Sequence, residues 1–427
     1  MFENFLYAQL TRLAKKYLTA HHEVQLIAIV GTNDKAITRQ AVGTLLAQEK
    51  RVRLHEHMAS SRYATPLAIL GIKAPTDTKN ILGWFSVFRA ASRRIKEPTT
   101  VDVIVQELPL RKPGDMAEYG RYLHPHVALI TSVAAEHIEL FGSLDAVAQE
   151  YLSVGDMSEY VIVNRDRVDS SFAQYEHNAN ITTYGASDRA EYWIEADDIY
   201  GPHGTPIEIR GPEYSEPLHT NAQLVGTNAL LAALAGAVVA TKLGINEASI
   251  AKGISHIATL PGRMNPLHGI GQTLILDDTY RAHPDAAIAG LQALYEFDTA
   301  PQRIAILSSF PDLAQLSADE HKRVGALCNP DLLAWVIVVG EDAKTYLAPA
   351  ARKRGCQVKV CNDAIEAAQF ARSVTEHGAV ILVEGSSKET YLEETTKILC
   401  DVSEESKLVR QGWPWRAIKN DHFSRFK

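Results

Sequence analysis

The sequence predicts an α/β protein built on mostly parallel sheets that helices cover. Short runs of β-branched residues alternate with longer helical patterns, which is typical of parallel strands joined by crossover helices. The chain has 427 residues, more than a single ordinary core accommodates. Its strand candidates form two groups on either side of a Pro-Gly pair at Pro261, where we place the main boundary. We therefore expect one α/β domain over 24–260 and another over 261–427.

The N-terminal segment, residues 1–23, predicts an amphipathic helix. Its apolar residues recur at helical spacing, and five of them fit one face: Phe5, Leu6, Leu10, Leu13 and Leu18. The segment lacks the charged start, apolar centre and small-residue cleavage site that follow one another in a signal peptide. We interpret it as part of the folded protein.

Strands of the first domain are expected where apolar and β-branched residues cluster. The candidates are VQLIAIV at Val24, VDVIVQEL at Val101, VALITSV at Val127 and YVIVN at Tyr160. Helical patterns fall between or after them, as in SLDAVAQEYLSV and NALLAALAGAVVATKLG. Over 181–220 the chain becomes polar with short β-like runs, which predicts a small antiparallel appendage on this domain.

The second domain repeats the alternation of strands and helices. Its strand candidates are TLILDD at Thr273, RIAILSS at Arg303, AWVIVVG at Ala334, QVKVC at Gln357 and AVILVEG at Ala379. A helical pattern, AIEAAQFARSV, precedes the last of them. A second parallel sheet covered by helices is therefore expected.

Composition excludes several classes of function. The net charge of -8 argues against a nucleic-acid partner, which requires a basic face. The most apolar run begins at Ala229 and is 13 residues long before Lys242, shorter than the about 20 apolar residues that span a bilayer. Zinc is not expected, because none of the 4 cysteines forms a CxxC pair, and free thiols in a reducing cytoplasm are the favoured interpretation.

The stretch AIVGTNDKAIT, which begins at Ala28, has the order strand, Gly-x-x-x-Lys, helix. Backbone N–H groups at a helix N-terminus bind phosphate, and a lysine adds a positive charge. On its own the pattern is weak, and a strand-to-helix turn with a chance lysine is the alternative. Further segments decide between the two.

Four later segments occur with this loop in the order and spacing of one family. They are VQELPLRKPGDMAEY with the VALITSVAAEHIELFGSLDAVAQEY that follows it, LVGTNALLAALAG, LPGRMNPL and LDDTYRAHPDA. Together they resemble the Mur ligases, ATP-dependent enzymes that join an amino acid or peptide to a carboxylate in peptidoglycan synthesis. The subgroup that adds D-alanyl-D-alanine is the most similar. The resemblance runs from about Leu26 onward and implies a P-loop-like central domain followed by a C-terminal Rossmann-like domain.

The resemblance also implies roles for individual residues. It assigns catalysis to Lys35, Glu107, His137 and Arg263, with Glu107 and His137 holding magnesium. ATP is implied to contact Gly31, Thr32, Asn33, Lys35, Asn228 and Asp278. Each assignment has a structural alternative: Glu107 as a helix cap, His137 as a core histidine, Arg263 as the partner of a surface acid. The matched order of the segments favours the functional roles.

Several positions depart from the family pattern. Asp34 replaces the glycine before the loop lysine, and Ala36 replaces a hydroxyl residue that ligates magnesium in the family. Tyr151 stands where the family has a lysine that is carbamylated to supply a further metal ligand. In the second domain Arg281 and His283 replace two asparagines, Glu384 a lysine, and Thr227 a histidine. The family's N-terminal UDP-binding domain has no counterpart in the about twenty residues before the first predicted strand.

These departures leave three hypotheses. We favour a pseudoenzyme, or a strongly impaired enzyme, that acts by binding a cell-wall precursor, another small molecule or a protein partner, because the changes concentrate on the ATP and magnesium positions. The alternative is a divergent but active carboxylate-amine ligase that uses ATP and magnesium and forms an acyl phosphate. The third is a subunit whose site a partner completes.

Overall fold

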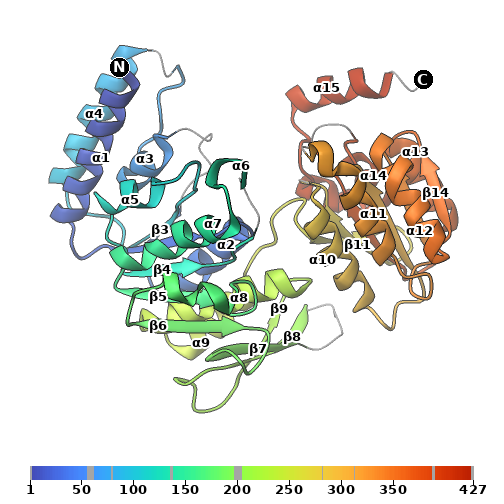
Figure 1. The fold of residues 1–427 in the computed structure, drawn as a ribbon, viewed down its shortest axis with the longest axis horizontal. Coiled ribbons are helices and arrows are strands. Elements are labelled where there is room, and N and C mark those ends of the chain that lie inside the picture. The colour runs from blue at the N-terminus through green and yellow to red at the C-terminus, as the bar shows by residue number, and fades with distance from the viewer. Residues whose placement is uncertain are drawn as a thin grey trace. The chain divides into compact units, whose positions relative to one another are not determined.

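The structure is a computed structural model that describes residues 2–54, 62–77, 80–134, 138–196, 204–280, 282–311, 313–386 and 390–424. The chain forms two compact units. The first comprises Met1–Ala196, Pro206–Ala222 and Ala229–Ala258, and the second comprises Asp197–Thr205, Gln223–Asn228 and Thr259–Lys427. Each unit contains one sheet with helices packed on it, which confirms the predicted α/β class (Figure 1).

Among the described residues, the sheet of the first unit has nine strands in the order β2-β3-β1-β4-β5-β6-β7-β8-β9. Their bounds are β1 Gln25–Val30, β2 Val52–Leu54, β3 Val103–Glu107, β4 Val127–Ile130, β5 Tyr160–Asn164, β6 Ile181–Gly185, β7 Tyr192–Ala196, β8 Thr205–Arg210 and β9 Leu218–Ala222. Strand β1 is buried over nearly its whole length and lies between β3 and β4, parallel to both. The four strands predicted for this domain are all present.

The segment 181–220 continues this sheet. Strand β6 pairs in parallel with β5, and β7 pairs in parallel with β6. Antiparallel pairing begins between β7 and β8. The β-like residues are thus an edge of the large sheet rather than a body of their own, because the register carries on from β5 without a break.

The α-helices that begin in the first unit are α1 Phe2–Ala20, α2 Lys35–Leu46, α3 Ala64–Leu70, α4 Ile81–Lys96, α5 Asp115–Gly120, α6 Ile138–Phe141, α7 Leu144–Leu152 and α9 Glu247–Ser255. Helix α8, Thr227–Lys242, has ten successive buried residues. A helix that is buried on all sides is apolar on all sides, which accounts for the long hydrophobic run in the sequence. Two 3₁₀ segments occupy Ser153–Met157 and Ser170–Tyr175. No helix among the described residues is long and apolar enough to cross a membrane.

The predicted N-terminal helix is α1, which packs beside α4 (Figure 1). Leu6 and Leu10 are buried in a small core with Trp84. The inclusion of Phe5 on the buried face was wrong, since its side chain is 56% exposed. The buried face runs from Leu6 through Leu10 to Tyr17, and Phe5 lies about 100° around the helix from Leu6.

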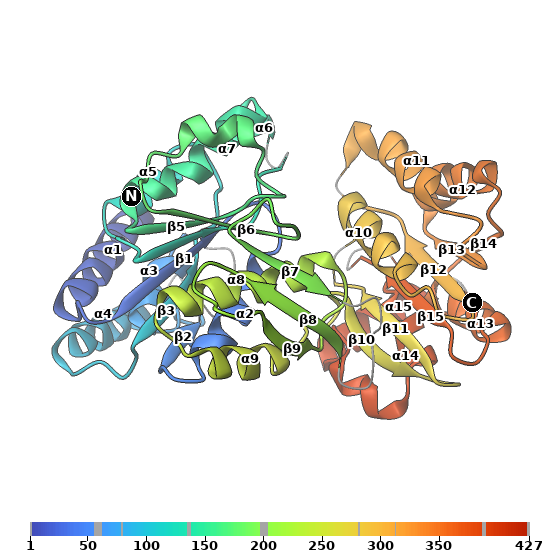
Figure 2. The same cartoon turned by 90° about the horizontal axis from the view of Figure 1, so that it is seen from below.

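In the part of the chain that the structure describes, the sheet of the second unit has six strands in the order β10-β11-β15-β12-β13-β14 (Figure 2). The strands are β10 Asn265–Gly269, β11 Thr273–Asp278, β12 Arg303–Ser308, β13 Trp335–Val339, β14 Val358–Cys361 and β15 Val380–Glu384. All neighbours pair in parallel except β10 with β11. The five predicted strands of this domain are present, and β10 adds an antiparallel edge.

The helices of the second unit are α10 Pro284–Tyr295, α11 Ser317–Leu327, α12 Ala348–Arg354, α13 Ala364–Val374, α14 Glu393–Leu399 and α15 Trp413–Ser424. Shorter helical segments occupy Ala314–Leu316, Ala343–Leu347 and Val402–Lys407. Two hydrophobic clusters lie in this unit, consistent with a sheet that buries both faces. All four cysteines are buried and free of disulfides.

Candidate phosphate-binding site

The carboxyl ends of three parallel strands meet in the first unit. Pairing aligns Ile29 of β1 with Glu107 of β3, and Val30 of β1 with Ile130 of β4. The loop after β1, the last residue of β3 and the residues after β4 therefore lie at one edge of the sheet. Strand β1 is also where the strand order reverses direction, which is where ligands bind in open parallel sheets.

Gly31 opens the loop in a conformation that favours glycine, with φ of 132°. A Cβ atom at this position would collide with the Thr131 hydroxyl and approach the backbone of Ser132 to 2.9 Å. The loop thus packs directly on the chain that leaves β4. Only glycine fits there without moving one of the two segments.

Hydroxyl groups after β4 hold the rest of the loop. Thr32 Oγ1 lies 2.9 Å from Ser132 Oγ, and the same Ser132 oxygen accepts a hydrogen bond from Asn33 N at 2.9 Å. Thr131 Oγ1 donates to the carbonyl of Asn33 at 2.7 Å. These contacts fix the loop backbone before any ligand arrives.

Asp34 occupies the N-cap position of α2 in the left-handed conformation, with φ of 62° and ψ of 5°. Glycine adopts this conformation at no steric cost, and aspartate is among the few other residues that tolerate it. The loop backbone therefore keeps a shape suited to the family's glycine. What changes is charge: burial raises the pKa of Tyr184, and the Asp34 carboxylate adds to that rise.

Lys35 is the first residue of α2, and its side chain turns back over the loop. Its Nζ donates hydrogen bonds to the carbonyls of Gly31 and Thr32, the latter at 3.0 Å. The ammonium charge is thereby held at the loop, where a phosphate group would need it.

Arg39 lies one turn after Lys35 on α2 and reaches the end of β3. Its Nη1 is 3.1 Å from Glu107 Oε1, and the two side chains are only 9% and 13% exposed. The carboxylate that the resemblance assigns to magnesium is therefore engaged by a guanidinium. Sequence reasoning missed Arg39, although its spacing of four residues from Lys35 on one helix was a usable signal.

Thr131 and Ser132 were also missed as loop-fixing residues. The available signal was two hydroxyl residues directly after the buried strand VALI, next to the strand that carries the loop. In a parallel sheet such positions lie beside the neighbouring strand's loop. The sequence alone does not predict that β4 is the neighbour of β1, so this signal could not be used.

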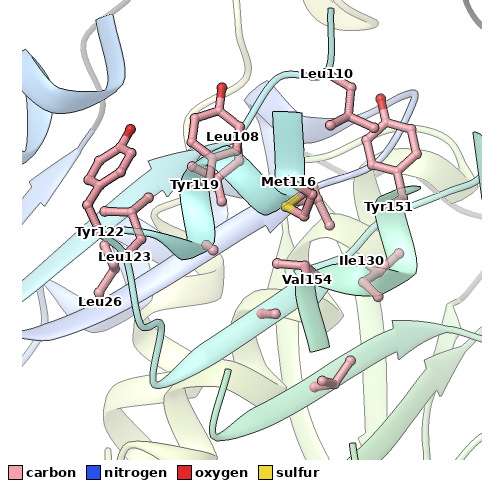
Figure 3. Packing of buried hydrophobic residues seen from close by; sticks show 14 of the residues in the cluster. Leu26, Leu108, Leu110, Met116, Tyr119, Tyr122, Leu123, Ile130, Tyr151 and Val154 are labelled. Carbon is pink, nitrogen blue, oxygen red and sulfur yellow. The ribbon is translucent and has the colours of Figure 1, made fainter. Parts of the chain in front are cut away.

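Tyr151 lies in the hydrophobic core of the first unit. Its side chain is 3% exposed and belongs to the main hydrophobic cluster of the unit, with Leu110, Met116 and Val154 (Figure 3). The position of the family's carbamylated lysine is thus filled by an aromatic ring in the core.

Of the positions that the resemblance ties to magnesium, the structure describes Glu107, Ala36 and Tyr151. Glu107 is ion-paired, Ala36 has no side-chain oxygen, and Tyr151 lies in the core. His137 falls outside the described residues. Within the described ranges, no group of three or more His, Cys, Asp or Glu side chains is placed to hold a metal ion.

Restoring the family's lysine at Tyr151 alone is expected to destabilise the protein by about 3 kcal/mol, because an ammonium group would enter a hydrophobic core. Tyr151→Phe keeps the ring and is the control, with an expected loss of about 1 kcal/mol. Urea unfolding of both variants measures the difference. Equal stability of the lysine variant and the wild-type protein would contradict this prediction, because it would mean that the ammonium group reaches water or a polar partner.

In the second unit, Arg263 and Asp278 lie at the start of the domain. The Arg263 guanidinium lies 4.4 Å from the centre of the Tyr280 ring, in a cation–π contact, and has no ion pair with an acid among the described residues. Asp278 ends β11, and its Oδ1 accepts a hydrogen bond from Met264 N at 3.2 Å. Asn228 lies in the first turn of α8, directly after the exposed Thr227.

His283 has a local structural role. It is the N-cap of α10, and its Nδ1 accepts a hydrogen bond from Asp285 N at 3.3 Å. Arg281 falls outside the described residues. Glu384, at the end of β15, is fully buried beside Asp278, and burial followed by the Asp278 charge raises its pKa well above the ordinary range.

Comparison with known protein families gives two matches along the chain. Residues 29–240 match the Mur ligase middle domain, and residues 262–387 match the Mur ligase glutamate ligase domain. The chain belongs to the Mur ligase family, as its motifs predicted.

Several named Mur ligases resemble this chain in sequence or in structure. The UDP-N-acetylmuramoyl-tripeptide--D-alanyl-D-alanine ligase of Bacillus subtilis is 22% identical over 334 residues, which cover 78% of this chain and 66% of that ligase. MurF from Acinetobacter baumannii has a TM-score of 0.70 at 19% identity, covering 91% of this chain and 79% of that one. The MurF ligase from Thermotoga maritima in complex with ADP has a TM-score of 0.69 at 19% identity, covering 92% and 83%. This chain is thus related to peptidoglycan-precursor ligases and spans about two thirds of the Bacillus relative.

Proposed function

We propose that this chain is a Mur ligase homologue that binds a phosphate-bearing ligand, a cell-wall precursor or a nucleotide, at the Gly31–Lys35 loop without performing magnesium-dependent phosphoryl transfer. The observation that carries the proposal is the ion pair between Arg39 and Glu107. Phosphoryl transfer depends on cations that neutralise the transferring group, and Glu107, the described residue that the resemblance assigns to magnesium, is paired with Arg39 instead. His137 and Arg263 remain proposed site residues by resemblance.

The negative charge of Asp34 at the loop is expected to weaken ATP binding. Asp34 places a carboxylate beside the only lysine of the loop. Two like charges about 4 Å apart repel by about 4 kcal/mol at an effective dielectric near 20, so an aspartate that faces phosphate weakens polyphosphate binding severely. A ligand with a single phosphate group suffers less from this repulsion than a triphosphate does.

A second candidate function is an active amide ligase related to the D-alanyl-D-alanine-adding enzymes. The observation in its favour is the loop backbone, since Gly31 and Asp34 both hold left-handed φ values and Lys35 is retained. In that case an acyl phosphate would form on a carboxylate substrate and an amine would displace the phosphate. Asp34 itself would have to contribute a metal ligand.

Calorimetry with a non-hydrolysable ATP analogue separates the two candidates. We expect wild-type protein with magnesium to show a Kd weaker than about 100 µM, and the double variant Asp34→Gly, Ala36→Thr to bind at least about tenfold more tightly. The backbone at Asp34 already suits glycine, so this variant changes charge and oxygen ligands rather than the fold.

Lys35→Ala in the same double variant is the control and should abolish the gain. An ADP-release assay with UDP-N-acetylmuramoyl-tripeptide and D-alanyl-D-alanine tests the active ligase directly. Turnover by the wild-type chain that Lys35→Ala removes would establish the second candidate and overturn the first.

A further inference from the structure

The partner of Glu107 is fixed by the fold rather than by a ligand. Arg39 comes from α2 and Glu107 from the end of β3, two elements that pack on each other within the first unit. Their side chains are almost entirely shielded from water, with Nη1 and Oε1 3.1 Å apart. A shielded pair of this kind is screened little by salt, so the contact persists in solution.

A guanidinium at this place competes with a divalent cation in two ways. It stays charged at every accessible pH. Its Nη1 lies 3.1 Å from Glu107 Oε1, an oxygen that magnesium would need as a direct ligand and that accepts no hydrogen bond among the described residues, so the contact is purely ionic. The guanidinium also adds positive charge beside the position where the ion would sit. Of the other positions tied to magnesium by the resemblance, Ala36 has no side-chain oxygen and Tyr151 is buried in the hydrophobic cluster.

We propose that Arg39 replaces magnesium as the counter-cation of Glu107, so that a phosphate-bearing ligand binds at Gly31–Lys35 without a divalent cation. The ligand part of this inference rests on the proposed function, in which the loop is the phosphate site. The exclusion of the metal rests on the ion pair alone.

Manganese, a spectroscopic substitute for magnesium, tests the exclusion directly. In an electron paramagnetic resonance titration, we expect the wild-type chain and the Glu107→Gln variant to bind Mn²⁺ equally, because the wild-type chain has no Mn²⁺ site that depends on Glu107. Arg39→Met frees the carboxylate and is expected to create a Mn²⁺ site at least about tenfold tighter, which the double variant Arg39→Met, Glu107→Gln loses again. Arg39→Lys keeps a cation in place and should still exclude Mn²⁺.

Two results overturn the proposal: a Glu107-dependent Mn²⁺ site in the wild-type chain, or a folded Arg39→Met variant that gains no Mn²⁺ site. Circular dichroism checks the fold of each variant. If Arg39→Met does not fold, Arg39→Gln, which keeps a polar side chain of similar reach, takes its place in the titration.

ADP binding, followed by ³¹P NMR in magnesium and in EDTA, tests the ligand part. We expect the two affinities to agree within about twofold, whereas tightening by magnesium of more than about tenfold contradicts magnesium independence. Absence of ADP binding in both conditions, and of inorganic phosphate binding, would remove the proposed function instead. The Mn²⁺ titration would then still decide the role of Arg39.

Discussion

Arg410→Met is expected to destabilise the second unit by about 3–5 kcal/mol, because it leaves a buried carboxylate without its main partner. Arg410 and Glu393 are 6% and 0% exposed, and their side chains meet at 2.7 Å. Arg410 also donates hydrogen bonds to the carbonyls of Thr279 and Tyr280, which directly follow the strand end at Asp278. Lys419, at 3.0 Å from Glu393, compensates only part of the loss.

Arg323→Met is the matched control for this prediction. Arg323 meets Asp285 at the same distance of 2.7 Å, but the two side chains are 45% and 56% exposed. Its loss should cost less than about 1 kcal/mol, since water solvates exposed charges. Native-state hydrogen exchange of the β11 and β15 amides measures both variants, and equal effects would show that burial is not what gives the Arg410 pair its weight.

Asp277 is expected to make the second unit less stable as the pH rises from about 4 to about 7. Its side chain is fully buried, and burial raises the pKa of this carboxyl from 3.8 to about 7. Thr279 and Thr396 donate hydrogen bonds to Oδ1 at 2.7 Å and 3.2 Å, while Oδ2 has no hydrogen-bond partner among the described residues. The fold therefore favours the protonated acid.

The sign follows from the order of the two pKa values. Below about pH 4 the carboxyl is protonated in both states, so it contributes no pH dependence. Between about pH 4 and 7 the unfolded chain loses the proton while the folded chain keeps it, which costs about 4 kcal/mol of stability in all. Burial also raises the pKa of Glu384, which adds a change of the same sign.

Asp277→Asn should remove the part of this pH dependence that Asp277 contributes, leaving that of Glu384, and stabilise the unit at pH 8. Asp319→Asn, at a carboxyl that is 83% exposed, is the control and should keep the wild-type dependence. Urea unfolding at a series of pH values measures the slope. A wild-type second unit whose stability rises over this range would contradict the protonated state assigned to Asp277.

Much of the fold could be read from local patterns. Runs such as VQLIAIV and AVILVEG are buried strands because parallel strands covered on both faces must be apolar at every position. The continuous apolar run at α8 predicts a buried helix for the same reason. Phe5 shows the limit, since neighbouring apolar residues on a helix can differ in burial by a small rotation.

The candidate site was predictable only in part. Lys35 and the glycine loop are contiguous in sequence, so the motif alone indicates a phosphate-binding turn. From the sequence, Asp34 is interpreted as the loss of the family's glycine. The backbone at Asp34 nevertheless keeps the left-handed conformation, which an aspartate tolerates but does not predict. From the sequence, Tyr151 is interpreted as the loss of a metal ligand, and in the structure its side chain packs in the hydrophobic core.

By itself, the sequence determined the α/β class and the positions of the central strands of both sheets, because strand burial follows from local periodicity. Its collinear motifs indicated the Mur ligase family. Only the tertiary structure decided that Arg39 neutralises Glu107, that Thr131 and Ser132 fix the loop, and that Arg410 holds Glu393. These contacts join segments far apart in the chain. The contacts at the loop depend on strand order and register, and the Arg410 pair depends on how α14 packs, neither of which leaves a pattern in the sequence.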